Sequence, residues 1–352
     1  MLFPAALQIG QAALDAAGIA AAERRGRRRD NVVSDVLSDI LDTIHLAGTL
    51  YFRTDFSAPW AVQVPDFMEA ARFHLVVQGR CNVSFASGQQ VNLQAGDLIL
   101  IPKGRAHVLA DSAGRPAAPL EQVIKDSGYT GAGIFALGVE NLDASTQMVC
   151  GHFSFRDGAD HPLLQALPEF IVISAATRAR VPLLGEVLHL IERKTLANDL
   201  GTAAALARLS EILFIELLSV GISGSPEFVR ITSALKDRQI GRALSLIHAE
   251  PGRAWTVEAL ARELGMSRSS FSDRFRDLVG CGAISYVADW RLQKALAMLD
   301  ESNWSTREIA TRSGYRSPAA FTRAFAAKFA TSPTRYRSAG LPPKQQQESR
   351  QA

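Results

Sequence analysis

Short runs in which apolar and polar residues alternate fill much of the first half of the chain. Five of them lie between about Arg72 and Leu109, separated by Gly, Ser, Asn and Lys-Gly turns, and read FHLVVQG, CNVSFA, QQVNLQ, DLILIP and AHVLA. After the Gly/Pro/Ala-rich stretch DSAGRPAAPLEQ, further runs follow at GIFALGV, TQMVCGHFSF and EFIVISA. A period of two bounded by turn residues predicts β-strands. Strands this short and numerous predict a small barrel or jelly roll.

Beyond Pro182 the period of the apolar positions changes to 3.6, which predicts amphipathic helices. One apolar stripe consists of Leu184, Val187, Leu188 and Ile191, and a second of Leu206, Leu209, Leu213 and Leu217. Two interpretations are open for these stripes. Both cover the sheet, or the second, which is surrounded by Ile212, Phe214 and Ile215, packs against a copy of itself in a dimer.

After Glu227 the chain has a helical pattern throughout. The pattern is broken at GRAW, LGMS, VGCGA, ESNWS, SGYRS and ATSPT. We therefore expect an α+β protein in which an N-terminal β-barrel is followed by a helical connector and a C-terminal all-α module.

Length and composition limit the class of protein. A chain of 352 residues is too long for one ordinary core and fits two domains. With 47% hydrophobic and 21% charged residues, it is neither collagen-like, nor a disulfide scaffold, nor wholly disordered. No run of about 18 uncharged apolar residues occurs, so we expect no membrane-spanning helix.

Two further features place the protein in the cytoplasm. Its cysteines, Cys81, Cys150 and Cys281, are far apart and form no C-x-x-C pair, which suits a reducing compartment. In residues 1–30 an Arg cluster follows the apolar part, which is the reverse of a secretory signal. This basic extension and the polar tail 341–352 are expected to be flexible.

The net charge of +3 conceals an uneven distribution. Residues 31–240 contain 16 Lys+Arg against 22 Asp+Glu, a balance of −6, whereas residues 241–340 contain 15 against 9, a balance of +6. A basic half indicates a nucleic-acid partner. A solvated surface would carry the same charges, so the sequence pattern has to decide.

The basic module contains an internal repeat. Ala261-Arg-Glu-Leu-Gly265 precedes Met266, Ser267, Phe271 and Phe275, and about 50 residues later Ala310-Thr-Arg-Ser-Gly314 precedes Tyr315, Arg316, Ser317, Phe321 and Phe325. Each copy combines a small residue for close helix packing, a Gly for a tight turn, a Ser N-cap and two inward Phe side chains. This pattern is typical of a helix-turn-helix. A plain helical bundle would explain one copy, but two copies in a basic module favour DNA binding.

The C-terminal third resembles the DNA-binding module of the AraC/XylS family of bacterial transcription regulators. The resemblance covers about residues 236–338 and rests on WTVEALARELGMSRSSFSDRF, YVADWRLQKALAML, and IATRSGYRSPAAFTRAF with SPTRYR. The chain departs from the family at Gly280-Cys281-Gly282-Ala283, where G-x-S-P is usual, and at Ala330, where Gly is usual. Both departures concern the local starts of helices.

The resemblance implies that the second helix of each copy lies in the major groove. The helix between the copies, about Ala283 to Leu299, would set their separation to about one turn of the duplex. The outward residues then become the expected base readers: Ser269, Ser272, Asp273, Ala319, Thr322 and Arg323. Of these, Arg323 is the strongest candidate, because a guanidinium can bind guanine in a bidentate manner. The expected phosphate contacts are Arg268, Arg276, Arg312 and Arg316.

The N-terminal half resembles the cupin-type sensor domain that is often attached to these regulators. Residues 96–107 fit the second cupin motif, G-x5-P-x-G-x2-H, and FHLVVQG and HPLLQALP extend the resemblance over about residues 35–175. It implies that His107 points into the barrel. We expect a small-molecule effector there, with His74 and His107 as polar groups of its pocket.

A metal-dependent cupin enzyme is an alternative, because many cupins bind a metal with two or three His and a carboxylate. No H-x-H lies upstream of Gly79, so His74 and His107 alone fall short of a facial triad. Cys150, His152 and His161 would complete a site if the fold brought them close. A third interpretation is a thiol-sensing regulator that acts through Cys81 or Cys281.

The sequence is therefore interpreted as a DNA-binding transcription regulator without catalytic residues, metal or cofactor. Its expected partners are promoter DNA, a small effector, RNA polymerase and a second copy of the chain, with no membrane. The expected division is 1–30 extension, 31–177 cupin-like domain, 178–227 connector and dimerisation region, 228–340 DNA-binding domain, and 341–352 tail.

Overall fold

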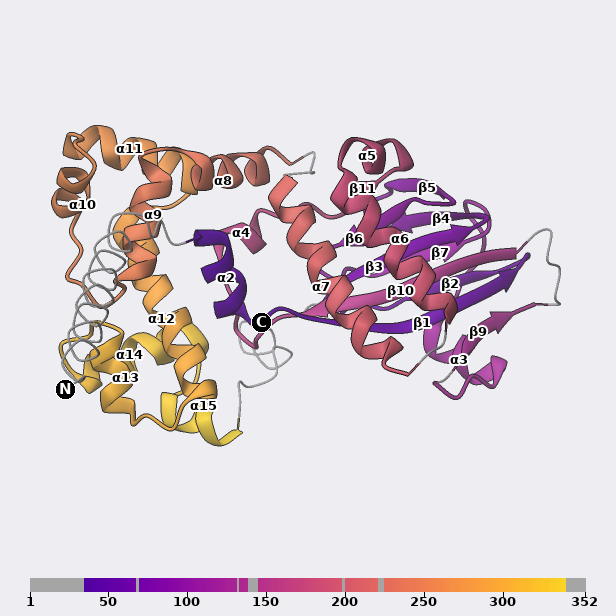
Figure 1. Ribbon diagram of the computed structural model, residues 1–352. Coiled ribbons are helices and arrows are strands. Elements are labelled where there is room, and N and C mark those ends of the chain that lie inside the picture. Colours follow the sequence, from indigo (N-terminus) through magenta and orange to yellow (C-terminus); the bar gives the residue numbers. More distant parts are fainter. Residues whose placement is uncertain are drawn as a thin grey trace, which may run out of the picture.

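The computed structural model describes residues 35–67, 70–131, 133–138, 145–197, 200–220 and 225–339. The predicted extension 1–30 and tail 341–352 lie outside these residues. A sheet-rich part is followed by a helical part (Figure 1), which confirms the α+β prediction. No helix of the described ranges is both long and apolar enough to cross a bilayer.

Two sheets face each other and form the barrel. The six-stranded sheet has the order β11-β6-β3-β10-β1-β9, and the five-stranded sheet has the order β5-β4-β7-β2-β8. The strands are β1 (Ala47–Ser57), β2 (Ala61–Val64), β3 (Ala70–Gln78), β4 (Arg80–Phe85), β5 (Gln90–Gln94), β6 (Leu98–Ile101), β7 (His107–Ala110), β8 (Ala118–Pro119), β9 (Ile134–Leu137), β10 (Ser145–Ser154) and β11 (Ile171–Ile173).

Every strand expected from alternation is present, but the pattern missed β1, β2 and the two-residue β8. β1 pairs antiparallel with β10 along its length and parallel with β9. Three consecutive polar residues, Arg53, Thr54 and Asp55, interrupt the apolar positions of β1, which hides its strand character. Short helices α3 (Leu120–Ser127) and α4 (Pro162–Gln165) connect strands, and α5 (Ala175–Arg180) follows the last strand, β11.

The two faces of β3 belong to two different cores. Phe73 and Leu75 are fully buried on the outer face, where helices cover the sheet. His74 and Val76 point between the two sheets, where Val76 joins Met148 and other apolar residues of the barrel interior. A strand buried on both sides explains why FHLVVQ is nearly continuous in apolar residues.

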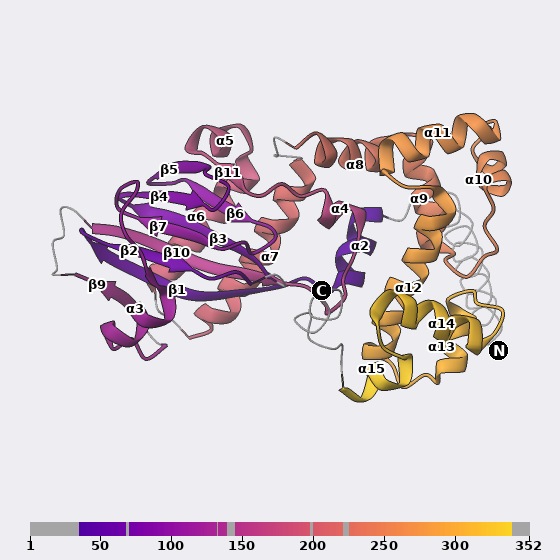
Figure 2. The same ribbon diagram turned by 180° about the vertical axis from the view of Figure 1, so that it is seen from behind.

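Helices α6 (Pro182–Ala197) and α7 (Thr202–Val220) lie across the six-stranded sheet, in front of it in Figure 1 and behind it in Figure 2. Leu206, Leu213 and Leu217 are at most 1% exposed and belong to the core that this sheet shares with the helices. The first interpretation of this stripe is therefore confirmed: it covers the sheet. The close approach requires glycine at Gly48, where a Cβ atom would lie 2.7 Å from the carbonyl oxygen of Ala207.

One helix of the N-terminal part escaped the sequence analysis. Helix α2 (Val36–Ile44) begins at Asp35, whose carboxylate accepts hydrogen bonds from the amides of Leu37 and Ser38. Ile40 and Ile44 are fully buried. Both views place α2 between the barrel and the helical module (Figures 1 and 2), and it contacts α9 and α12 of that module.

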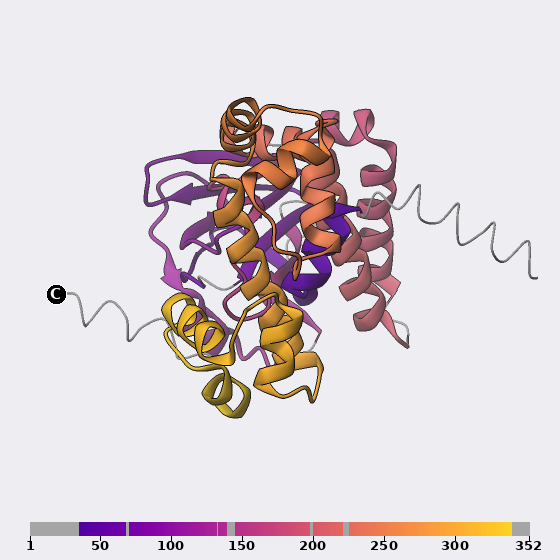
Figure 3. The same ribbon diagram turned by 90° about the vertical axis from the view of Figure 1, so that its left-hand side faces the viewer.

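The helical module is organised around one long helix, α12 (Ala283–Glu301). Figure 3, which looks onto the module, has α10 and α11 toward the upper end of α12 and α13 to α15 around its lower end. The remaining helices are α8 (Pro226–Lys236), α9 (Ile240–Ala249), α10 (Val257–Glu263), α11 (Arg268–Val279), α13 (Thr306–Arg312), α14 (Pro318–Phe329) and α15 (Pro333–Ala339).

The two departures from the family pattern have different structural outcomes. Gly280 ends α11 in the left-handed conformation with φ of 89°, and α12 begins at Ala283 after Gly282, which offers no capping side chain. Ala330 ends α14 with φ of 55°, a conformation that costs a residue with a Cβ roughly 1–2 kcal/mol.

We therefore expect Ala330→Gly to stabilise the protein by about 1 kcal/mol, because glycine adopts positive φ without this penalty. Part of the gain is offset by the greater freedom of glycine in the unfolded chain. Thermal unfolding monitored by circular dichroism measures the change, with Ala326→Gly inside α14 as the destabilising control. A lower melting temperature for Ala330→Gly would contradict the assignment.

Candidate nucleic-acid interface

The first helix-turn-helix consists of α10, a turn and α11. Gly265 adopts φ of 64° in the turn, and the amide of Met266 donates to the carbonyl of Ala261 at 2.9 Å. Ser267 caps α11 by accepting a hydrogen bond from the amide of Ser270 at 3.2 Å. Phe271 is fully buried beneath α11.

The second unit, α13 and α14, repeats this geometry. Gly314 adopts φ of 76°, and the amide of Tyr315 donates to the carbonyl of Ala310, again at 2.9 Å. Ser305 and Glu308 form a capping box at the start of α13. Ser317 caps α14 and accepts from the amide of Ala320 at 3.2 Å. The repeat in the sequence is thus a repeat of the same backbone hydrogen bond and the same cap.

Helix α12 holds the two units apart. Its N-terminal half, including Tyr286 and Trp290, packs in one core with Phe271 and Phe275. Its C-terminal half, including Leu296, packs in a separate core with the Phe residues of α14. Each unit therefore has its own hydrophobic support on a shared helix, and the two Phe side chains of each unit are buried, as predicted.

The expected base readers all remain accessible on the described surface. Ser269, Asp273, Ala319 and Arg323 are exposed, and Ser272 and Thr322 are half-buried. Asp273 makes no ion pair among the described residues, since its neighbour Arg274 instead pairs with Asp237 at 2.5 Å. The guanidinium of Arg323 also makes no hydrogen bond or ion pair within the described ranges, so it is available to a ligand.

The four expected phosphate contacts are exposed as well, but they differ in their surroundings. Arg268 pairs with Glu258 at 2.9 Å, and both side chains are mostly exposed. The guanidinium of Arg312 lies 3.8 Å from the ring centre of Trp304. Arg276 and Arg316 make no contact of either kind in the described structure. Two of the four arginines are thus pre-oriented and two are free to reach a phosphate.

Inside the barrel, the two predicted pocket histidines lie in direct contact. The Nε2 atoms of His74 and His107 are 2.9 Å apart, and Nδ1 of His74 lies 3.0 Å from Sγ of Cys150. Nδ1 of His107 lies 2.7 Å from the carbonyl oxygen of Arg105, so this nitrogen must carry a proton. One consistent chain follows for neutral rings: the Cys150 thiol donates to His74, His74 donates to His107, and His107 donates to the carbonyl of Arg105.

Burial keeps the side chains of this hydrogen-bond chain neutral. It lowers the pKa of His107 to about 4 and the pKa of His74 well below its usual value, with the charge of Arg72 acting in the same direction on both. Burial also raises the pKa of the Cys150 thiol. Each ring nitrogen already has a partner. A metal ion would therefore have to break one of these hydrogen bonds before it could bind a nitrogen atom.

Comparisons with known proteins relate both halves to families. Residues 35–220 match the Cupin family and residues 260–339 match the Helix-turn-helix domain family. The chain is 30% identical to the HTH-type transcriptional regulator AlkR of Acinetobacter baylyi over 86% of its own length and 99% of the relative's. The chain belongs to the AraC/XylS family of transcription regulators. It is therefore a DNA-binding transcription regulator with a cupin domain.

Further comparisons report likenesses in sequence and in structure. An HTH-type transcriptional regulator of Haemophilus influenzae is 29% identical over 85% of this chain and 98% of the relative. The solved DNA-binding domain of AdpA, a global transcriptional factor in complex with target DNA, is 32% identical, covers 28% of this chain and 89% of that one, and has a TM-score of 0.28.

The barrel of this AraC/XylS member contains a small cavity of about 20 Å³, which is room for about one water molecule. Its lining is mainly aromatic and aliphatic: Phe52, Phe56, Val62, Val64, Leu109, Leu120, Phe135 and Met148, with Thr54, Arg72, His74 and Cys150 as its other members. His74 lines the cavity, whereas His107 contacts it through His74. Arg72 was missed by the sequence analysis, although it lies two residues before His74 on β3 and therefore faces the same side of the strand.

The three residues suggested as completing a metal site are not brought together. Cys150 lies beside His74, whereas His161 contacts Tyr286 of α12, with 3.0 Å between Nε2 and the hydroxyl oxygen. No group of three or more potential metal ligands occurs within the ranges that the structure describes. The idea that His161 joins the barrel histidines is wrong, because the segment after β10 leaves the barrel toward the helical module.

Proposed function

We propose that this regulator reads DNA through α11 and α14 and that a small molecule bound in its barrel controls the reading. The observation that carries the proposal is the duplicated helix-turn-helix on one supporting helix, with the outward residues of both second helices accessible. The proposed base readers remain Ser269, Ser272, Asp273, Ala319, Thr322 and Arg323, and the proposed phosphate contacts remain Arg268, Arg276, Arg312 and Arg316.

Two arginines of the second unit are expected to respond differently to substitution. Arg323 lies on α14 two positions after the buried Phe321, so it faces away from the core and is proposed to bind a guanine edge. Its replacement by Ala should cost about 1–3 kcal/mol and relax the preference at one base pair. Arg316 precedes the cap Ser317 and is proposed to bind a phosphate. Its loss should weaken all sequences alike and reduce the salt slope by about one.

Binding titrations test this pair of variants against the promoter next to the regulator's own gene and against duplexes with each base pair changed in turn. The two variants serve as controls for each other, because each removes one guanidinium from the same unit. If Arg323→Ala weakens every sequence equally and keeps the same preference at every position, Arg323 is not a base reader.

The barrel cavity is the proposed effector site. Its mainly apolar lining with a few polar groups is typical of small-molecule pockets, and an effector would have to expand the cavity on binding. His74 and His107 are proposed as the polar groups of this site, with His107 acting through its hydrogen bond to His74. Isothermal titration of the purified protein with candidate effectors checks this site, and His74→Ala is expected to abolish the heat of binding.

The surroundings of the cysteines and of the barrel histidines support neither alternative chemistry. The thiol of Cys150 is buried and its pKa is raised by burial, and burial also raises the pKa of Cys81 and of Cys281. Raised thiol pKa values disfavour the reactive thiolate. The His74–His107 chain does not fit a metal, because its nitrogen atoms are engaged with each other, with a thiol and with a carbonyl.

We expect the purified protein to contain far less than one metal ion per chain. A catalytic cupin needs at least three converging ligands, and the barrel presents two rings that bond to each other. Elemental analysis after gel filtration measures the content. A value near one zinc, iron or manganese per chain would contradict this expectation and favour the enzyme interpretation.

The remaining proposals concern partners, place and domain limits. We propose a homodimer, and the exposed apolar side chains Leu183 and Leu190 on α6 and Ile212 on α7 support it, since the inner stripe of α7 is already covered. Contact with RNA polymerase and a cytoplasmic location follow from a role at promoters. The proposed domain limits are 1–30, 31–177, 178–227, 228–340 and 341–352. Helices α6 and α7 of the connector 178–227 pack on the barrel of the cupin-like domain 31–177.

A further inference from the structure

The segment from β10 to α4, residues 156–161, lies against the long helix of the DNA-binding module. The guanidinium of Arg156 donates to the carboxylates of Asp300 and Glu301 at the C-terminal end of α12, and its Nε donates to the carbonyl of Thr43 in α2 at 3.2 Å. The side chain of Gln293, also on α12, donates to the carbonyl of Gly158 at 3.1 Å. We call residues 156–161 the coupling segment.

The coupling segment also reaches the second reading helix. Nζ of Lys328, near the end of α14, lies 3.1 Å from the carboxylate of Asp160 and 2.7 Å from the carboxylate of Asp289 on α12. The Lys328 side chain is only 16% exposed. One ammonium group thus joins α14, α12 and the coupling segment, and partial burial strengthens such a pair relative to an exposed one.

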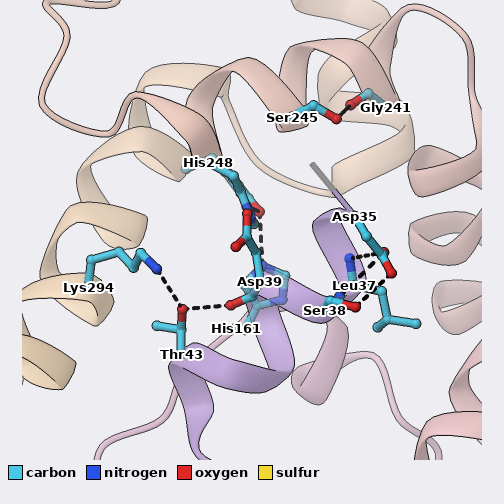
Figure 4. A network of polar contacts seen from close by, with 11 residues as sticks. Asp35, Leu37, Ser38, Asp39, Thr43, His161, Gly241, Ser245, His248 and Lys294 are labelled. Atoms are coloured by element: carbon cyan, nitrogen blue, oxygen red, sulfur yellow. Dashed lines mark hydrogen bonds and ion pairs between the residues drawn. The ribbon is translucent and has the colours of Figure 1, made fainter. Parts of the chain in front are cut away.

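A buried hydrogen-bond chain also links the coupling segment to α12 and α9. The amide of Leu163 donates to Nδ1 of His161, so the proton of the neutral ring is on Nε2, which donates to the hydroxyl of Tyr286 at 3.0 Å. The Tyr286 hydroxyl then donates to Nε2 of His248 at 2.6 Å. The remaining proton of His248 points toward Asp39 of α2, with 3.8 Å between Nδ1 and the carboxylate (Figure 4).

This chain requires neutral histidines and an ordered interface. Burial lowers the pKa of His161 to about 3 and also lowers the pKa of His248. His248 stacks on Trp290 with 3.8 Å between ring centres. The hydrogen-bond chain starts in the N-terminal part at His161, passes through Tyr286 and His248 of the helical module and returns toward α2 of the N-terminal part, so neither part can move relative to the other without leaving buried polar atoms unsatisfied.

The strand that leads into the coupling segment lines the effector cavity. Met148 and Cys150 of β10 face the cavity, and β10 continues into Arg156 within two residues of its last member, Ser154. β10 is hydrogen-bonded on both sides, to β1 and to β3. A shift of β10 caused by a molecule beside Met148 would therefore move the coupling segment as well.

The docked arrangement does not cover the reading surface, because all six proposed base readers remain exposed or half-buried. What the contact can change is the position of α14 relative to α12, since Lys328 is bonded to both α12 and the coupling segment.

We propose that the coupling segment, through Asp160 and Lys328, transmits the state of the barrel cavity to the second helix-turn-helix. This inference rests on the proposed function, because it assumes that α14 binds DNA. Lys328 is a positioning residue in this account: it holds α14 and touches neither DNA nor effector. Coupling between two sites is reciprocal, so DNA bound to α14 must also alter the order of β10 and the coupling segment.

Hydrogen–deuterium exchange of the full chain tests the reciprocal effect without knowledge of the effector. Exchange is measured for peptides covering residues 145–161, in the free protein and in protein saturated with a duplex of its own promoter. We expect a change in exchange rate of about fivefold or more on DNA binding, which corresponds to a typical coupling between sites. In Asp160→Asn this change should disappear while DNA binding persists.

Asp157→Asn is the matched control, because it removes the same charge from the same segment at an exposed position that makes no contact with Lys328. Lys328→Met, whose fold is checked by circular dichroism, should lose the change as Asp160→Asn does. Wild type that binds the duplex with unchanged exchange in 145–161, or an Asp160→Asn variant that behaves as Asp157→Asn does, would overturn the coupling. Wild type that binds no promoter duplex would instead overturn the proposed function, and the coupling with it.

Discussion

A fragment containing residues 225–339 is expected to bind duplex DNA, and its affinity should fall about a thousand-fold between 50 and 200 mM salt. The fragment contains both helix-turn-helix units and α12, and it begins at Ser225, which caps α8. With about six phosphate contacts, the slope of log K on log salt would be roughly −5, since each contact contributes about −0.9. Fluorescence anisotropy at four salt concentrations measures this slope.

The barrel provides the control for this experiment. A fragment ending at residue 220 retains the cupin domain and has a negative charge balance, so it should not bind the same duplex at any of these salt concentrations. A helical fragment that is folded by circular dichroism yet shows no salt-sensitive binding would contradict the assignment of the DNA-binding module.

The second large effect is expected from Leu213→Lys in α7. Leu213 is fully buried between α7 and the six-stranded sheet. Removal of its side chain alone would cost about 2–5 kcal/mol, and the buried ammonium adds a further penalty. We expect the cupin domain to unfold or to lose at least about 4 kcal/mol of stability. Thermal unfolding followed by circular dichroism measures the loss.

Ala204→Lys is the control, because this side chain is exposed on the same helix and is not one of the apolar side chains proposed to support the dimer. Its effect on stability should stay within about 0.5 kcal/mol. A Leu213→Lys protein that remains as stable as Ala204→Lys and merely changes from dimer to monomer would revive the interpretation of the inner stripe as a dimer surface.

The helix-turn-helix units could be predicted in detail because their determinants are local. The small Ala, the turn Gly, the Ser cap and the inward Phe lie within about fifteen residues of each other, and each enforces its own part of the geometry. The same holds for the strands from β3 to β7, whose alternation and turns are contiguous. Segments in which several local signals agree can therefore be predicted from sequence.

The elements that the sequence analysis missed depend on distant partners. β1 takes its place through pairing with β10, about a hundred residues later, and with β9, whereas α2 is fixed by contacts with α9 and α12. Helix α2 has an N-cap at Asp35 and an apolar face, so the helix itself could have been predicted from sequence. Its position between the barrel and the helical module could not.

Within the candidate sites, types of residue were easier to predict than their partners. The contact between His74 and His107 agrees with the cupin motif, but the bond from Cys150 needs the register of β10 against β3, in which Cys150 lies opposite His74. His161 was considered a possible metal ligand because histidine is a common ligand. Its actual partner, Tyr286, is 125 positions away in the sequence, and no local pattern links the two.

The central claim is that two helix-turn-helix units on one supporting helix read one face of the duplex together. Hydroxyl-radical footprinting of the full chain on its own promoter tests this claim most directly. The account predicts two protected patches about one helical turn apart on the same face, both of which weaken when Phe321 is replaced by Ala and the second unit loses its core. A single protected patch in the wild type, or uniform protection along the duplex, would contradict it.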